Sequence, residues 1–176
     1  MRRVRSFVND LFEIARLEIG DELDLEPIPP LELIADAARS LRPQADLGGI
    51  QLHVTAHPAV EDVSGDGHRL MRACENLLSN AIRHASDHVR IGAVASAQDV
   101  CLFVEDDGLG FGGPKGPVDL STVSKQAAQA DSSGLGLLVA RGVAEAHGGS
   151  IAASNGSHWT RVELRIPRDS SNQPAE

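Results

Sequence analysis

Two asparagines four residues apart, Asn76 and Asn80, stand in the segment HRLMRACENLLSNAIRHA, residues 68–85. In an α-helix this spacing places both amides on one face, which Arg72 and Arg83 extend by a turn on either side. Amide oxygens can ligate a hard divalent cation, and guanidinium groups can bind the phosphates that accompany it. Taken alone, the pattern is more typical of a solvated helix face, so other parts of the chain must decide between the two interpretations.

Two glycine clusters further along the chain favour a nucleotide site. In DDGLG, Asp106 ends an apolar, strand-like segment, where its carboxylate can accept a hydrogen bond from an exocyclic amine such as adenine N6. Gly108 and Gly110 let a flat ring approach the backbone. In SSGLGL, residues 132–137, small residues open a predicted helix, so free backbone amides face an anion such as phosphate. Either cluster alone is also consistent with a turn or a helix entry.

Apolar periodicity predicts the elements that carry these residues. The central helix has an apolar stripe at spacings of three and four, formed by Leu70, Cys74, Leu77 and Ala81. Residues 112–133 are rich in Gly, Pro, Ser and Gln, which predicts a mobile lid between the glycine clusters. The other predicted elements are a helix over 31–45, strands over 50–55 and 60–63, an Asp66 N-cap for the central helix, a hairpin over 89–95 and 100–105, a helix from 135 to the Gly148-Gly149 pair, and a closing hairpin over 151–154 and 159–166.

The chain divides into four predicted parts. Residues 1–20 form an amphipathic helix, residues 21–30 a proline-containing linker, residues 31–167 the main domain and residues 168–176 a disordered tail. An amphipathic helix on a linker predicts assembly into a homo- or hetero-oligomer through that helix. The alternative is that the helix packs on its own domain.

The composition limits the class of protein. A chain of 176 residues has room for one well-buried domain and a short appendage. A formal net charge of -9 argues against binding to nucleic acid or anionic lipid. The two cysteines form no CxxC motif or disulfide framework, and the sequence has no apolar run of the kind found in signal peptides and membrane spans. We therefore expect a cytoplasmic protein with no membrane span.

The motifs ENLLSNAIRHA, DDGLG and SGLGL, followed by a helix that ends in AHGG, resemble the ATP-binding domain of sensor histidine kinases. The resemblance covers residues 28–167 and extends to the larger family that includes gyrase, Hsp90 and MutL, whose ATP-binding domain is called the Bergerat fold. It implies an α+β fold, a two-layer sandwich with helices on one face of a mixed sheet. It also implies ATP and Mg²⁺ as cofactors and a role in two-component signalling.

The resemblance assigns roles to individual residues. Asn80, with help from Asn76, would hold Mg²⁺, and Asp106 would read adenine. Arg83 stands where the family often has a phosphate-contacting lysine, and His84 would lie beside the nucleotide. The remaining implied nucleotide-binding residues are Gly108 and Gly110 around the base, and Ser133, Gly134, Leu135, Gly136 and Leu137 around the phosphates.

The sequence departs from the family's pattern in three places. Phe111 is the only aromatic residue between the first glycine box and Ser133, so the family's phenylalanine-rich box is absent. Ser132 replaces the glycine that usually opens the second box. Residues 1–20 look like the second helix of a dimerisation domain, and the helix that carries the phosphoacceptor histidine in the family is not in this sequence.

We therefore predict an ATP-binding subunit of a histidine kinase. It would transfer the γ-phosphate of Mg-ATP to a histidine on a partner protein, or on a segment outside this sequence, upstream of a response regulator. Two alternatives stay open, a degenerate nucleotide-binding module without turnover and a serine kinase of the anti-sigma type. A hydrolase of the gyrase or Hsp90 type is disfavoured, because those proteins place a glutamate general base one turn before the Mg²⁺ asparagine, where this chain has Asn76.

Overall fold

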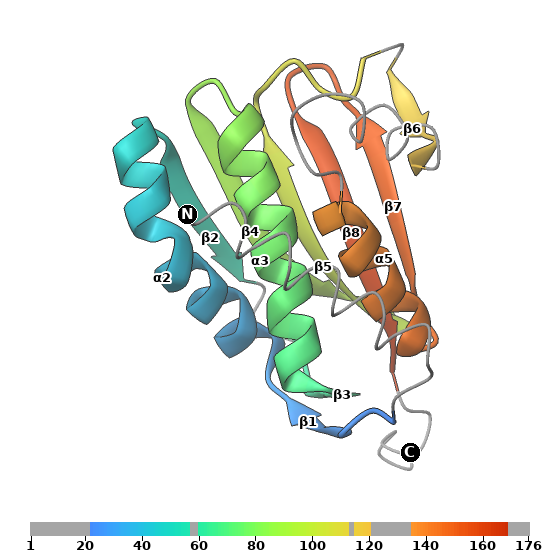
Figure 1. Ribbon diagram of the computed structural model, residues 1–176. Coiled ribbons are helices and arrows are strands. Elements are labelled where there is room, and N and C mark those ends of the chain that lie inside the picture. Colours follow the sequence, from blue (N-terminus) through green and yellow to red (C-terminus); the bar gives the residue numbers. More distant parts are fainter. Residues whose placement is uncertain (1–21, 57–59, 113–114, 121–134, 169–176) are drawn as a thin grey trace.

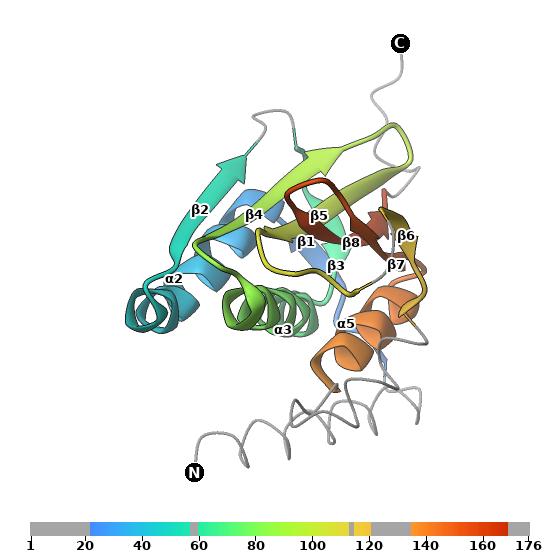
Figure 2. The ribbon, with the colours of Figure 1, turned by 90° about the horizontal axis from the view of Figure 1, so that it is seen from above.

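The computed structural model describes residues 22–56, 60–112, 115–120 and 135–168. Within these ranges, three helices cover one face of a six-stranded mixed sheet, and a two-stranded sheet lies at one end of the molecule (Figure 1). Seen from above, the helices and the large sheet form two layers (Figure 2). The predicted α+β two-layer fold is confirmed.

The large sheet has the strand order β2-β4-β5-β8-β7-β6. Strands β2 and β4 run parallel, and the other neighbours run antiparallel. The small sheet pairs β1 with β3. The elements in chain order are β1 (Glu26–Ile28), α2 (Pro30–Gly48), β2 (Gln51–Ala56), β3 (Val63–Gly65), α3 (Gly67–His84), β4 (His88–Ala95), β5 (Asp99–Asp106), β6 (Gly116–Val118), α5 (Leu135–Ala146), β7 (Ser150–Asn155) and β8 (Thr160–Pro167).

Helix α3 is the centre of the helical layer, packed between α2 and α5 and against the sheet. Its predicted N-cap is confirmed, because the Asp66 carboxylate accepts a hydrogen bond from the backbone N–H of Arg69 at 3.0 Å. The predicted apolar stripe is buried throughout, at Leu70, Cys74, Leu77 and Ala81. This packing fixes the orientation of the opposite, polar side of the helix.

The sequence does not predict two short strands. Strand β1 lies in the predicted linker over 21–30, and β6 lies in the predicted lid over 112–133. Each contains a proline, Pro27 or Pro117, which lacks the N–H of a strand ladder and resembles a turn signal in the sequence. Because Ile28 is buried and β1 pairs with β3, this part of the predicted linker packs on the main domain.

Several predicted features lie outside the described residues. These are the amphipathic helix over 1–20, the lid segment over 121–134 with Ser133 and Gly134 of the second glycine box, and the tail beyond residue 168. In the part of the chain that the structure describes, no helix combines the length and the apolar character needed to cross a membrane.

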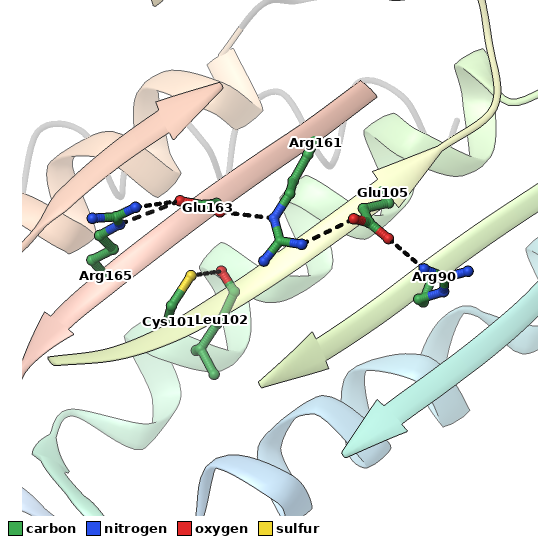
Figure 3. A network of polar contacts seen from close by, with 7 residues as sticks. All are labelled: Arg90, Cys101, Leu102, Glu105, Arg161, Glu163 and Arg165. Carbon is green, nitrogen blue, oxygen red and sulfur yellow. Dashed lines mark hydrogen bonds and ion pairs between the residues drawn. The ribbon is translucent and has the colours of Figure 1, made fainter. Parts of the chain in front are cut away.

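A row of alternating charges crosses the helix-free face of the sheet (Figure 3). Its members, on β4, β5 and β8, are Arg90, Glu105, Arg161, Glu163 and Arg165. Arg161 stands near the middle, with ion pairs of 3.0 Å to Glu105 and 2.7 Å to Glu163. Its guanidinium also lies 3.9 Å from the centre of the Phe103 ring, which is only 5% exposed. The row therefore shields an aromatic side chain on the open face of the sheet.

Candidate nucleotide-binding site

Helix α3 brings its asparagines to the neighbouring helix α5. Asn76 and Asn80 are both half-buried. A Cβ placed on Gly136, in the first turn of α5, would lie 3.5 Å from Asn76 Cγ and 3.6 Å from Asn76 Oδ1. The structure therefore brings together the asparagine face and the second glycine box, which stand far apart in the sequence.

The side chain of Asn76 places a buried polar atom at the contact between α3 and α5. Its Nδ2 atom is buried and has no hydrogen-bond partner among the residues that the structure describes. Buried polar atoms are nearly always hydrogen-bonded, since leaving one unpaired costs about 1–3 kcal/mol. Among the described residues, this unpaired N–H donor between two helices is what a site prepared for a ligand with acceptor atoms would show.

The last turn of α3 carries Arg83 and His84, whose side chains are exposed. The pKa of His84 is lowered from its ordinary value, first because partial burial disfavours the charged ring and then because Arg83 adds a nearby positive charge. Both side chains are accessible to a ligand that lies at this end of the helix.

Asp106 is the last residue of β5 and is 8% exposed. Its Oδ1 atom accepts a hydrogen bond from the backbone N–H of Gly108 at 3.0 Å. Burial raises the pKa of this carboxyl from 3.8 to about 6; the Gly108 hydrogen bond opposes the rise and the charge of Asp107 adds to it. Asp106 is thus a buried hydrogen-bond acceptor whose charged form is destabilised by burial, and carboxylates of this kind are common at functional sites.

The loop after β5 requires glycine at two positions. A Cβ on Gly108 would lie 2.0 Å from the carbonyl oxygen of His84, so only glycine lets the loop lie this close to the end of α3. Gly110 has φ +72°, and a Cβ there would lie 2.8 Å from Asn155 Oδ1. The first glycine box is therefore enclosed between the end of α3 and the hairpin formed by β7 and β8.

Two residues of this hairpin contribute to the site although the sequence does not single them out. Asn155 accepts a hydrogen bond from the N–H of Phe111 at 3.2 Å and donates one to the carbonyl of Gly112 at 3.1 Å. Thr160 is 5% exposed and is paired with Asp106 across β5 and β8. The Asn-Gly dipeptide marks only a turn, and no local pattern connects it to a loop more than 40 residues earlier.

The first turn of α5 is the third element of the candidate site, after α3 and the loop that follows β5. Leu135, Gly136 and Leu137 are half-buried, and this turn contains no acidic residue. The first N–H groups of a helix have no partner within the helix and attract anions. Figure 1 shows that β5 and α3 end at the same edge of the molecule, towards which the N-terminus of α5 also points.

Comparison with known proteins identifies the family. Residues 65–170, more than half of the chain, match the family described as histidine kinase-, DNA gyrase B-, and HSP90-like ATPase. The chain belongs to this ATPase family. This match and the relatives below confirm the predicted resemblance to the ATP-binding catalytic domain of sensor histidine kinases.

Two curated relatives show how much of a longer protein this ATPase domain represents. Sensor protein SphS of Synechococcus elongatus is 35% identical over 206 residues, an alignment that covers 99% of this chain and 46% of SphS. The probable sensor histidine kinase TcrY of Mycobacterium tuberculosis is 29% identical, with coverage of 95% of this chain and 36% of TcrY. The chain thus spans less than half the length of either relative.

Solved structures share the fold. Full-length ShkA in complex with AMPPNP is 25% identical, with a TM-score of 0.77 over 92% of this chain and 35% of ShkA. The catalytic domain of histidine kinase ThkA is 20% identical and has a TM-score of 0.68 over 82% of this chain and 96% of that domain. At that identity the ThkA likeness concerns the fold alone.

Proposed function

We propose that this chain binds Mg-ATP and is the catalytic part of a histidine kinase that transfers the γ-phosphate to a protein histidine. The observation that carries the proposal is that helix α3 contacts both glycine boxes. Its His84 carbonyl lies against Gly108, in the loop after Asp106, and its Asn76, whose buried Nδ2 has no partner among the described residues, lies opposite Gly136. The AMPPNP complex of the related ShkA supports the choice of nucleotide. Because the reaction consumes ATP, we place it in the cytoplasm.

The residues present fit this pair of cofactors. Asp106 would accept a hydrogen bond from the adenine amine, beside a loop whose glycines lie against the end of α3 at Gly108 and against Asn155 at Gly110. Asn80 and Asn76 would hold Mg²⁺, which would offset the negative charge of the phosphates. Elsewhere in the described ranges, no group of three or more His, Cys, Asp or Glu side chains offers an alternative metal site. Arg83 and residues 133–137 would contact the nucleotide phosphates, and His84 would lie beside the nucleotide.

The environment of Glu75 supports transfer over hydrolysis. A general base that activates water would have to face the phosphates from this helix, where Asn76 and Asn80 lie. The carboxylate of Glu75 instead accepts a hydrogen bond of 2.7 Å from the Ser40 hydroxyl of α2, on the opposite flank of α3 from α5. Neutral amides bind a cation but accept no proton, so positioning a protein nucleophile is the better use of this site.

The acceptor would be a histidine on a partner protein or on another segment of the same protein. All seven histidines of this sequence lie between residues 53 and 158, within the predicted ATP-binding domain. We expect the helix predicted over residues 1–20 to recruit the acceptor and to mediate oligomerisation. A response regulator would then receive the phosphoryl group; histidine kinase ThkA, whose fold this chain shares, forms a complex with the response regulator protein TrrA.

A phosphorylation assay tests the proposal. The chain is incubated with γ-labelled ATP, Mg²⁺ and a two-helix polypeptide that carries a phosphoacceptor histidine. We expect acid-labile, base-stable label on that polypeptide, none on this chain alone, and none with Asn80→Ala. The matched control is Gln98→Ala, which removes a side-chain amide from the exposed turn between β4 and β5 and should leave transfer unchanged.

The same assay separates the two alternative functions. Acid-stable label on a partner would favour a serine kinase of the anti-sigma type. Saturable binding of Mg-ATP without transfer to any partner would favour a degenerate nucleotide-binding module. Label on this chain alone would contradict an acceptor outside the ATP-binding domain.

A further inference from the structure

Asp107, the neighbour of the adenine-reading candidate, has a different environment from Asp106. Its Oδ1 atom accepts backbone hydrogen bonds from Ser86 at 2.9 Å, Asp87 at 3.1 Å and His88 at 3.0 Å. Its own N–H donates to the carbonyl of His88 at 3.2 Å. One residue thus holds three consecutive residues, two in the loop between α3 and β4 and the third, His88, at the start of β4.

This loop connects the two halves of the proposed adenine pocket. It begins where α3 ends, and the His84 carbonyl at that end touches the backbone of Gly108. Its far end starts β4, in which Val89 pairs with Asp106. The Asp107 carboxylate therefore joins the end of the asparagine helix to the end of the strand that carries Asp106.

We propose that Asp107 is a positioning residue, whose carboxylate holds the α3–β4 loop against the first glycine box and so keeps the adenine end of the pocket formed. This inference rests on the proposed function, because it concerns the same nucleotide site. If the loop adopts the binding conformation only part of the time without this carboxylate, affinity falls in proportion to that fraction. We expect the lost affinity to come mainly from contacts with the base, because α3 and α5 would contact the phosphates.

The test measures two quantities in the intact chain and in the variants Asp107→Ala and Asp107→Asn. The first is the hydrogen exchange rate of the backbone amides of residues 86–88. The second is the affinity for Mg-ATP and for Mg-GTP, whose base has an oxygen where adenine has its amine. Asp87→Asn is the matched control, because it removes a neighbouring carboxylate whose side chain is exposed and leaves the backbone donors in place.

We expect Asp107→Ala to accelerate exchange at residues 86–88 and to weaken Mg-ATP binding roughly threefold to tenfold, with a smaller change for Mg-GTP. Asp107→Asn keeps one acceptor oxygen and should fall between the alanine variant and the intact chain. Unchanged exchange, or an equal loss for both nucleotides, would overturn the positioning role. Absence of nucleotide binding by the unmodified chain would instead contradict the proposed function, and the exchange rates would still decide whether Asp107 holds the loop.

Discussion

The same substitution at two adjacent residues, Asp106→Asn and Asp107→Asn, should change stability in opposite directions. Burial raises the pKa of Asp106 from 3.8 to about 6, so its charged form destabilises the folded domain at neutral pH. The difference of about 2 pKa units corresponds to about 3 kcal/mol, and allowing for solvent screening we expect about 1–3 kcal/mol. Asparagine removes this charge while its Oδ1 can still accept the hydrogen bond from Gly108.

The pKa of Asp107 is shifted in the opposite direction. Burial tends to raise its pKa, but hydrogen bonds from the backbone of residues 88, 87 and 86 outweigh that tendency, and the pKa lies below its ordinary value. The charged form therefore stabilises the fold. Asp107→Asn should destabilise the domain by about 1–2 kcal/mol, since a neutral amide oxygen accepts these bonds less strongly.

Thermal unfolding as a function of pH measures both effects. The stability that protonated Asp106 contributes is fully present below pH 3.8, and it is lost as the pH rises through about 6. Asp106→Asn should therefore raise the melting temperature of the nucleotide-free chain at pH 7, by roughly 2–4 °C per kcal/mol, and the gain should vanish near pH 4. The contribution of Asp107 is present above its ordinary pKa and is lost as the pH falls through its lowered value.

The two variants should rank the other way round in nucleotide affinity, so the variant that gains stability should bind less tightly. Asp106→Asn should weaken Mg-ATP binding roughly tenfold or more, because it removes a charge-assisted hydrogen bond worth about 1.5–3 kcal/mol, and Asp107→Asn should weaken it less. In the intact chain, affinity should fall as the pH drops below about 6 and Asp106 gains a proton. A less stable Asp106→Asn variant, or equal affinity losses in the two variants, would refute this reasoning.

Three further predictions concern other parts of the molecule. Asn80→Ala should remove most of the dependence of ATP affinity on Mg²⁺, as calorimetric titration with and without the cation would show. Arg161→Ala should lower the free energy of unfolding by about 1–2 kcal/mol, since it exposes the Phe103 ring and breaks two ion pairs. The control Arg165→Ala removes an exposed side chain from the same row and should lower the free energy of unfolding by less. Deleting residues 1–20 should leave a folded, ATP-binding monomer, and a monomeric intact chain that recruits no acceptor would contradict the role of that segment.

Much of the fold follows from local patterns in the sequence. The three- and four-residue spacing of apolar side chains predicts α3, and runs of apolar and alternating residues predict β4, β5 and β8, because each of these elements buries apolar side chains against the core. Helix α2 extends beyond its predicted end at residue 45, to Gly48, and stops where Gly49 adopts φ +71°. Strand β3 lies at Val63–Gly65, later than the predicted strand, because its position is set by pairing with β1, which the sequence does not reveal.

The candidate site was only partly predictable for the same reason. Asn76, Asn80 and Asp106 stand in compact motifs, so their residue types and spacing indicate their chemistry. Asn155 and Asp107 act through backbone groups that are distant in the sequence, and no local pattern records such contacts. The raised pKa of Asp106 likewise depends on burial by elements from several parts of the chain.

The central claim is that α3, the end of β5 and the start of α5 form one nucleotide site. Titrating Mg-ATP into the isotope-labelled chain and following its backbone amides by NMR tests this most directly. We predict saturable shifts at residues 76–84, 106–110 and 135–137, and little change along the charged row around Arg161. Absence of saturable shifts, or shifts confined to that helix-free face, would contradict the account.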